Sequence, residues 1–247
     1  MTRHSKSKQL KLVLFDIDGT LLLADGQGRD AMENGIGRFL ERDIDADEID
    51  FGGRTDLEII QGIVEKHTDP SERNSGLIED TLDAFVEYCL SHWQDHRVKA
   101  LPGAVELVLS LANRTDLAIG LVTGNAERTA YRKLKSVGLE GHFPFGAFGD
   151  DHENRTELLQ IALRRAADLY GREFRIQDAC VVGDTTRDIR ACRNIGMPCL
   201  AVASGFHSRS LLTNHSPDAL LDSLSDTRIA ELEINRLLEI SVSTLSM

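Results

Sequence analysis

The amino-acid sequence predicts an α/β fold whose core is a parallel sheet and which carries an inserted α-helical segment. Short apolar runs at 12–15, 117–122 and 179–182 have the length and composition of strands that are buried on both faces, as in parallel sheets. Amphipathic stretches of helical spacing alternate with the later runs, which is typical of a sheet with helices on both faces. By contrast, residues 30 to 98 are helical in pattern and poor in strands.

The first strand, at 12–15, is followed by two acidic residues and then by a turn-like stretch at 23–28. Apolar residues next recur at approximate helical spacing, interrupted by two polar connectors, the first of them strongly acidic. We therefore expect a core domain made of residues 1–22 and 99–247, with an α-helical domain at 23–98 inserted into it. The apolar positions that predict these inserted helices are Ala31, Ile36, Phe39, Leu40, Leu57, Ile60, Val64, Leu77, Ile78, Leu82, Phe85 and Leu90.

After the insertion the chain returns to alternating strands and helices. Gly138 and Gly196 each follow an amphipathic stretch, at a position where a left-handed residue commonly ends a helix. The expected helices span residues 103–112, 126–137, 155–169, 186–195 and 226–239, and the expected strands span 117–122, 145–148, 179–182, 198–202 and 219–221.

The composition of the 247 residues is that of a globular protein, with 41% apolar and 28% charged residues. The net charge of −12 argues against a general nucleic-acid or anionic-membrane surface, although a local metal site can still bind a phosphate group. No apolar run is long enough to span a bilayer, and the basic start at 1–11 is unlike a secretory signal.

The four cysteines are interpreted as reduced and mostly buried thiols, as expected of a cytoplasmic protein, because no two of them form a Cys-x-x-Cys pair. We expect a monomer or a homodimer whose partner is a small molecule, and neither a nucleic acid nor a membrane. The cysteines are Cys89, Cys180, Cys192 and Cys199.

Two aspartates one residue apart, Asp16 and Asp18, follow the first predicted strand. The carboxyl ends of the strands in open α/β sheets are where ligands bind, and two carboxylates this close require a cation or a shared proton at neutral pH. Such a pair can bind Mg²⁺, and one member can attack an electrophile while the other moves a proton. A polar turn that merely ends the strand is the alternative interpretation.

A second polar stretch, Thr123-Gly124-Asn125, ends the strand at 117–122. A hydroxyl and free backbone N–H groups at a strand-to-helix turn suit a phosphate oxygen. The alternative is that Thr123 or Asn125 caps the following helix, and the two roles are compatible.

A third polar stretch follows the strand at 179–182, where Asp184 is expected to bind a metal through its carboxylate. Asp188 lies one helical turn further on and is expected to be a direct or an outer ligand. Thr185 and Asp188 also fit a capping box, which would explain Asp188 without a metal.

The string from Asp16 to Leu21, Asp-x-Asp-Gly-Thr-Leu, resembles the first signature of the haloacid dehalogenase superfamily. The position of Thr123 is similar to that of the second signature, a Thr or Ser that ends the next core strand. The stretch 183–188, Gly-Asp followed by a second Asp, resembles the fourth. The resemblance covers residues 12 to about 221, with the helical insertion where the type-1 cap domain of the superfamily lies.

The third signature is normally a Lys at the start of a core helix, and here the chain departs from the pattern. The segment 148–159 contains no Lys, and Arg155 is the cation in the corresponding place. A guanidinium can hold an aspartate and a phosphate with its planar fork, although an Arg at a helix start is also a common surface residue.

The resemblance implies a Rossmann-like core with a helical cap and the Mg²⁺-dependent hydrolysis of a phosphomonoester. Asp16 would form an aspartyl-phosphate, while Asp18 would protonate the leaving oxygen and then activate water. The dehalogenase branch lacks this second acid, so dehalogenation is not expected. The implied catalytic residues are Asp16, Asp18, Thr123 and Arg155, the implied metal ligands are Asp16, Asp18, Asp184 and Asp188, and the implied substrate-binding residues are Thr20, Arg54, Gly124 and Asn125.

The glycine-rich turn at 52–56 resembles the cap loop of phosphoglycolate phosphatase-like members of the superfamily, where this loop faces the substrate. Arg54 is therefore expected to contact the substrate, and a phosphoglycolate-like metabolite is the best single expectation. The alternative is an ordinary helix start, since Thr55 and Glu58 have the spacing of a capping box.

Three other functions remain open on the same fold. One is a phosphomutase similar to β-phosphoglucomutase. Another is a phosphonate hydrolase, which would need a cap lysine for a Schiff base, and Lys66 and Lys99 are the only lysines in the insertion region. The third is a binding or regulatory module without catalysis, against which the three aspartates Asp16, Asp18 and Asp184 argue.

Overall fold

The computed structural model describes residues 10–74 and 76–240, so the basic segment up to residue 9 lies outside the described part of the chain. The strands of the main sheet are β1 (Lys11–Phe15), β4 (Leu117–Val122), β5 (Gly146–Ala147), β6 (Ala179–Gly183), β7 (Cys199–Val202) and β8 (Ala219–Leu221). They form one sheet in the order β5-β4-β1-β6-β7-β8, and all neighbouring strands are parallel. The α/β fold with a parallel sheet is therefore confirmed.

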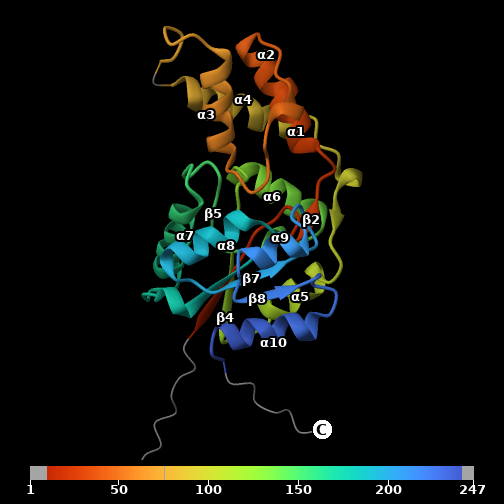
Figure 1. Cartoon of the computed structure of the whole chain (residues 1–247), viewed down its shortest axis with the longest axis vertical. Coiled ribbons are helices and arrows are strands. Elements are labelled where there is room, and N and C mark those ends of the chain that lie inside the picture. The colour runs from red at the N-terminus through yellow and green to blue at the C-terminus, as the bar shows by residue number, and fades with distance from the viewer. Residues whose placement is uncertain (1–9, 75, 241–247) are drawn as a thin grey trace, which may run out of the picture.

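Helices connect these strands and lie around the sheet (Figure 1). They are α5 (Ala104–Ala112), α6 (Glu127–Ser136), α7 (Arg155–Tyr170), α8 (Thr186–Ile195), α9 (Arg209–Asn214) and α10 (Thr227–Leu237). Each predicted helix of this part agrees with an observed one to within two residues at either end. Helix α9 was not predicted, because so short a helix shows little periodicity in the sequence.

Side chains of β1 alternate between two hydrophobic clusters, one on each face of the sheet. Val13 and Phe15 pack on the face that is covered by α5, α6 and α10. Leu12 and Leu14 pack on the opposite face, against α7, α8 and α9. Every residue of β4 and β6 is buried, as the continuous apolar runs in the sequence predict for a doubly covered sheet.

Between β1 and β4 the chain forms a separate group of helices, at the top of Figure 1. Met32, Ile60 and Phe85 belong to its own hydrophobic cluster. The chain leaves and re-enters the sheet-bearing part through a two-stranded antiparallel ladder, which is too short to have been predicted. The elements are β2 (Leu22–Leu23), α1 (Gln27–Ala31), the π-helix η1 (Met32–Ile36), α2 (Gly37–Leu40), η2 (Ala46–Glu48), α3 (Asp56–His67), α4 (Leu77–Ser91), η3 (Asp95–Arg97) and β3 (Lys99–Ala100).

All four cysteines are free and buried, in agreement with the expectation of reduced thiols. Burial raises the pKa of the Cys180 thiol, so this group is protonated at neutral pH. Within the described ranges, none of the helices combines the length and the apolar character that a membrane crossing requires.

A buried carboxylate joins the start of β1 to the loop that enters β6. Asp178 is fully buried, and its Oδ1 accepts hydrogen bonds from Lys11 Nζ at 2.7 Å and Arg175 Nη2 at 2.9 Å. Its Oδ2 accepts from Arg175 Nε at 3.0 Å. The hydrogen bonds from Arg175, and after them those from Lys11, hold the pKa of Asp178 well below its usual value against the effect of burial. The ionised carboxylate therefore stabilises the fold.

We expect Asp178→Asn to lower the free energy of unfolding at neutral pH by about 2 kcal/mol, because hydrogen bonds to charged groups are worth about 1.5–3 kcal/mol. The contribution is fully present above the pKa of an unfolded Asp, about 3.9. It is lost as the pH falls through the lowered pKa of the folded state. Urea unfolding of both proteins at neutral pH and near pH 3 measures the difference, which should shrink in acid.

The matched control is Asp222→Asn, which removes an exposed ion pair with Arg209. This variant should change the free energy of unfolding by less than about 0.5 kcal/mol. If Asp178→Asn had no larger effect than this control, Asp178 would not anchor β1.

Candidate active site

The carboxyl ends of three neighbouring strands place polar residues at one edge of the sheet. Asp16 follows β1, Thr123 follows β4, and Asp184 follows β6. Because β1 lies between β4 and β6, Asp16 is flanked by the other two residues. Open α/β sheets bind their ligands at this edge, and here the separate group of helices lies over it (Figure 1).

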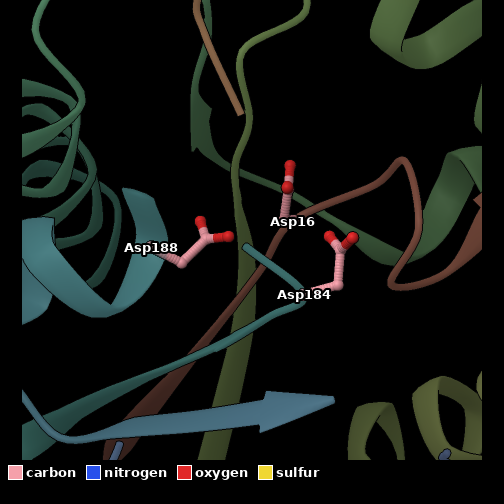
Figure 2. Close-up of side chains that lie close together, drawn as sticks. All are labelled: Asp16, Asp184 and Asp188. Carbon is pink, nitrogen blue, oxygen red and sulfur yellow. The ribbon is translucent and has the colours of Figure 1, made fainter. Parts of the chain in front are cut away.

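Three buried aspartates converge at this edge: Asp16, Asp184 and Asp188. One carboxylate oxygen of each lies within 4.8 Å of the others, and Figure 2 shows the three side chains gathered around a common point. Asp188 comes from the first turn of α8, where Thr185 N and Oγ1 donate to its Oδ2 at 3.0 and 2.6 Å. The predicted capping box is therefore present, and it leaves the other oxygen, Oδ1, to the cluster.

Arg155, the first residue of α7, reaches into this cluster. Its Nη2 lies 2.8 Å from Asp16 Oδ2 and 2.7 Å from Asp188 Oδ1, and the side chain is 8% exposed. Burial disfavours the charge of the guanidinium, but the carboxylates of Asp16 and Asp188 outweigh burial and raise the pKa of Arg155. The structure thus places Arg155 beside Asp16, whereas its catalytic role stays a prediction.

The charge balance of the cluster suits a divalent cation. Burial raises the pKa of Asp16 to about 6, with Arg155 opposing and Asp188 increasing the rise. Burial, followed by the charge of Asp16, also raises the pKa of Asp184. When all three are ionised, one guanidinium leaves two negative charges uncompensated. The three aspartates offer carboxylate oxygens, the ligand type that Mg²⁺ prefers, so this cluster fits Mg²⁺.

Thr20 does not line the cavity at this edge, contrary to the substrate contact expected for it. The residue is fully buried, and its Oγ1 donates to Asp184 Oδ1 at 3.3 Å, so it orients a candidate metal ligand. The backbone at Gly19 packs against the same carboxylate, that of Asp184. A Cβ at Gly19 would lie 2.3 Å from Asp184 Oδ2, and Gly19 has a φ of 78°, which glycine adopts without strain.

The carboxylate of Asp18 lies outside the three-aspartate cluster, so the structure does not support its side chain as a metal ligand. Instead, Asp18 Oδ2 lies 2.6 Å from Lys133 Nζ and accepts a hydrogen bond from Asn125 Nδ2 at 2.7 Å. Asp18 and Asp16 line the same cavity, which suits a residue that moves a proton near the nucleophile.

Lys133 is a candidate site residue that was missed from the sequence. It lies on the inward face of α6 with Ala130 and Leu134, and it is 6% exposed. Burial disfavours the ammonium group, but the carboxylate of Asp18 outweighs burial and raises the pKa of Lys133. A signal was available, because Lys133 follows Ala130 by three residues on the face of the predicted helix that should be apolar.

Thr123, Gly124 and Asn125 all lie on the cavity wall. Asn125 Nδ2 donates to Thr123 Oγ1 at 2.8 Å, and Asn125 Oδ1 accepts from Lys133 Nζ at 2.5 Å. Thr123 Oγ1 acts as an acceptor in these contacts, and phosphate binding by its hydroxyl stays a prediction. Gly124 permits close packing, since a Cβ there would lie 2.1 Å from Arg54 O.

The glycine-rich turn before α3 docks onto the sheet edge through its backbone. Asp56 N donates to Gly124 O at 2.7 Å, and Leu57 N donates to Gly149 O at 3.1 Å. Asp56 Oδ2 in turn accepts from Ala126 N at 2.8 Å, at the start of α6. Burial raises the pKa of Asp56 to about 7, and the N–H group of Ala126 opposes this rise.

Arg54 lines the cavity, but its guanidinium already faces a carboxylate. Arg54 Nε lies 2.9 Å from Glu58 Oε1, and Nη2 donates to Glu58 O at 3.3 Å. Thr55 Oγ1 accepts from Glu58 N at 3.1 Å, so Thr55 caps α3 as the alternative interpretation proposed. Substrate contact by Arg54 stays a prediction.

A single cavity of about 190 Å³ connects the sheet edge with the helices above it. Its wall includes Asp16, Asp18, Thr123, Lys133 and Arg155 from the sheet-bearing part, and Met32, Phe51, Ile59, Phe85 and Cys89 from the helical segment. The wall from the sheet-bearing part therefore carries the acidic and basic groups named above, whereas the wall from the helical segment is mostly apolar, with Arg29, Arg54 and Asp56 as its charged residues.

Neither lysine of the insertion region lines this cavity. Lys66 forms a surface ion pair with Glu48, and Lys99 is exposed in β3. Within the described residues, the Schiff-base lysine that a phosphonate hydrolase would need is therefore not found in the insertion.

Comparisons with known proteins agree with the fold. The profile of a family described as haloacid dehalogenase-like hydrolase matches residues 13–202. A phosphoglycolate phosphatase from Synechococcus elongatus is 33% identical over 144 residues, which are 56% of this chain and 62% of that protein. The chain therefore spans less than two thirds of this relative's length.

A pyrophosphatase, PpaX from Bacillus anthracis, matches along nearly its whole length. It is 24% identical over 231 residues, which are 92% of this chain and 99% of that protein. Among solved structures, a hydrolase from Pseudomonas syringae has the same fold, with a TM-score of 0.67 and 21% identity over 92% of this chain and 99% of that chain.

We expect Asp56→Asn to stabilise the protein above neutral pH. Because the pKa of Asp56 is raised to about 7, the folded chain keeps a proton that the unfolded chain releases near pH 4. The free energy of unfolding of the wild type therefore falls as the pH rises between these two pKa values. The Asn side chain of the variant does not titrate, and its oxygen can still accept the hydrogen bond from Ala126 N. Urea unfolding should show that the advantage of the variant grows by about 2 kcal/mol from pH 5 to pH 8.

The control for this experiment is Asp83→Asn, which changes an exposed carboxylate of α4. Its effect on the free energy of unfolding should stay nearly constant over the same pH range. An equally constant effect of Asp56→Asn would contradict the raised pKa of Asp56.

Proposed function

The chain belongs to the haloacid dehalogenase-like hydrolases, and we propose that it is a Mg²⁺-dependent phosphatase of a small phosphorylated metabolite. The observation that carries the proposal is that Asp16, a member of the three-aspartate cluster, lines one cavity together with Asp18, Thr123 and Arg155. The names of the two relatives refer to phosphoglycolate and to pyrophosphate, and attack on a phosphoryl group is the chemistry that these substrates share.

In the first step Asp16 attacks the phosphorus of the ester. The bond between phosphorus and the alcohol oxygen breaks, and Asp16 becomes an aspartyl-phosphate. Asp18 donates a proton to the departing oxygen. Arg155 and the hydroxyl of Thr123 bind the phosphoryl oxygens and hold the group in line with the nucleophile.

In the second step Asp18, now a carboxylate, takes a proton from the water that attacks the phosphorus of the aspartyl-phosphate. Inorganic phosphate leaves and Asp16 is regenerated. Asn125 and Lys133 hold the carboxylate of Asp18 in place for both transfers. A Mg²⁺ ion held by Asp16, Asp184 and Asp188 would supply positive charge that offsets the repulsion between nucleophile and phosphate.

We also propose that residues 23–98 act as a cap that excludes water from the reaction. The backbone contacts of Asp56 and Leu57 with the sheet edge support this role, as does the cavity shared by both parts. The four free thiols support a reducing, cytoplasmic setting, and the net charge of −12 supports a small-molecule partner over a nucleic acid.

We expect Asp16→Asn to lower phosphate release from 4-nitrophenyl phosphate by at least about 10³-fold, because the nucleophile is lost. Removing Mg²⁺ with a chelator should abolish the wild-type activity, and adding Mg²⁺ back should restore it. The control is Asp83→Asn, which should keep wild-type activity. Substantial release of phosphate by the folded Asp16→Asn protein would exclude Asp16 as the nucleophile.

We expect Lys133→Met to reduce kcat for an alkyl phosphate by about 10- to 100-fold, because Asp18 loses the partner that positions it as general acid. The loss should be smaller for 4-nitrophenyl phosphate, whose leaving group needs no proton. Lys135→Met is the matched control, since Lys135 is exposed on the same helix and should be neutral. Equal losses for both substrates would mean that Lys133 acts on the fold and not through Asp18.

A further inference from the structure

The half of the cavity that the helical segment contributes has largely apolar walls. Met32 from η1, Ile59 from α3 and Phe85 from α4 line it, and all three belong to the hydrophobic cluster of that segment. Because the phosphoryl group is held at the sheet edge, the rest of the substrate must lie against these side chains.

An exposed aromatic ring from the sheet-bearing part also lines the cavity. Phe206 follows β7, lines the cavity and is 59% exposed, which is high for a side chain of this type. Its backbone N–H donates to Asp184 Oδ2 at 2.8 Å, and a Cβ at Gly205 would lie 1.9 Å from the same oxygen. The packing around Asp184 therefore fixes the backbone from which this ring projects.

Every basic side chain on the cavity wall already faces a carboxylate of the described chain. Arg29 is also held by Phe51, with its guanidinium carbon 4.7 Å from the ring centroid. A carboxylate or a second phosphate on the alcohol part of the substrate would have to compete with these carboxylates for a cation, and burying such a charge without one is strongly unfavourable. The pairs are Arg29 with Asp47, Arg54 with Glu58, Lys133 with Asp18 and Arg155 with Asp16.

We propose that the alcohol part of the phosphate ester is uncharged and largely apolar, an alkyl or aryl group, in contrast to glycolate or a second phosphate. This inference rests on the proposed phosphatase activity and narrows its substrate class. It differs from the phosphoglycolate-like substrate expected from the turn at 52–56, because the cation of that turn, Arg54, is paired with Glu58.

The first experiment compares kcat/KM of the Mg²⁺-loaded wild type for methyl, propyl and hexyl phosphate, phenyl phosphate, phosphoglycolate and pyrophosphate. Each methylene that enters the cavity should raise kcat/KM by about fourfold until the cavity is filled. The values of kcat/KM for phosphoglycolate and pyrophosphate should be at least about tenfold lower than that for propyl phosphate, because the second charge of these substrates is buried without a partner. A preference for either anion over propyl phosphate would overturn the inference.

The second experiment uses two variants of the wall. Phe206→Ala should lower kcat/KM for hexyl phosphate by about three- to tenfold, because apolar contact with the long chain is lost. The value of kcat/KM for methyl phosphate should stay within about twofold of that of the wild type. Phe39→Ala is the control, since Phe39 is 42% exposed on α2 and does not line the cavity. Glu58→Gln removes the carboxylate that faces Arg54. This variant should raise the ratio of kcat/KM for phosphoglycolate to kcat/KM for propyl phosphate by about tenfold. Unchanged ratios in both variants would contradict the inference.

Binding of non-hydrolysable phosphonates separates this inference from the proposed activity. Calorimetry with the Mg²⁺-loaded wild type should show that hexylphosphonate binds at least about tenfold more tightly than phosphonoacetate. If no ester is hydrolysed but this order holds, the phosphatase proposal fails and the apolar site stands. If esters are hydrolysed but phosphonoacetate binds more tightly, the apolar site fails and the phosphatase proposal stands.

Discussion

The contact of Arg155 with Asp16 and Asp188 is the interaction on which the site depends. Strand order brings Asp16 and Asp184 to adjacent strand ends, and the first turn of α8 adds Asp188, so three acidic groups are buried in one place. Their repulsion would oppose folding, and the guanidinium at the start of α7 offsets part of it. The remaining negative charge makes the same place attractive to a divalent cation. The ion pairs of Arg155 therefore stabilise the fold and also set the charge of the candidate metal site.

Much of this arrangement follows from the sequence, because short-range rules decide it. Apolar runs identify strands that are covered on both faces, and parallel strands present their carboxyl ends at one edge, so Asp16, Thr123 and Asp184 were expected together. The start of α7 was predicted closely enough to place Arg155 among them. The strand ends needed only the apolar pattern of the chain, whereas Arg155 was singled out by the resemblance to the third signature.

Three features did not follow from the sequence, each for a physical reason. The position of Lys133 on an otherwise apolar helix face marks it as unusual, but its partner, Asp18, lies more than a hundred positions away, so the sequence does not reveal the pairing. Thr20 looks exposed in a polar turn, yet the fold around Gly19 turns its hydroxyl toward Asp184. The ladder of β2 and β3 consists of two residues on each side, which is too short for periodicity to reveal.

That ladder has a consequence for how such a protein can change. Leu23 and Lys99 are paired in this ladder, so the two ends of the helical segment between them lie side by side. The segment therefore leaves and rejoins the sheet-bearing part at adjacent points, as the two ends of a tight turn do, whatever the length of the segment. Lengthening a loop costs little closure entropy, because that entropy grows only with the logarithm of length. A helical segment of different length or lining can therefore join the sheet-bearing part at the same two points without a change in the register of the sheet.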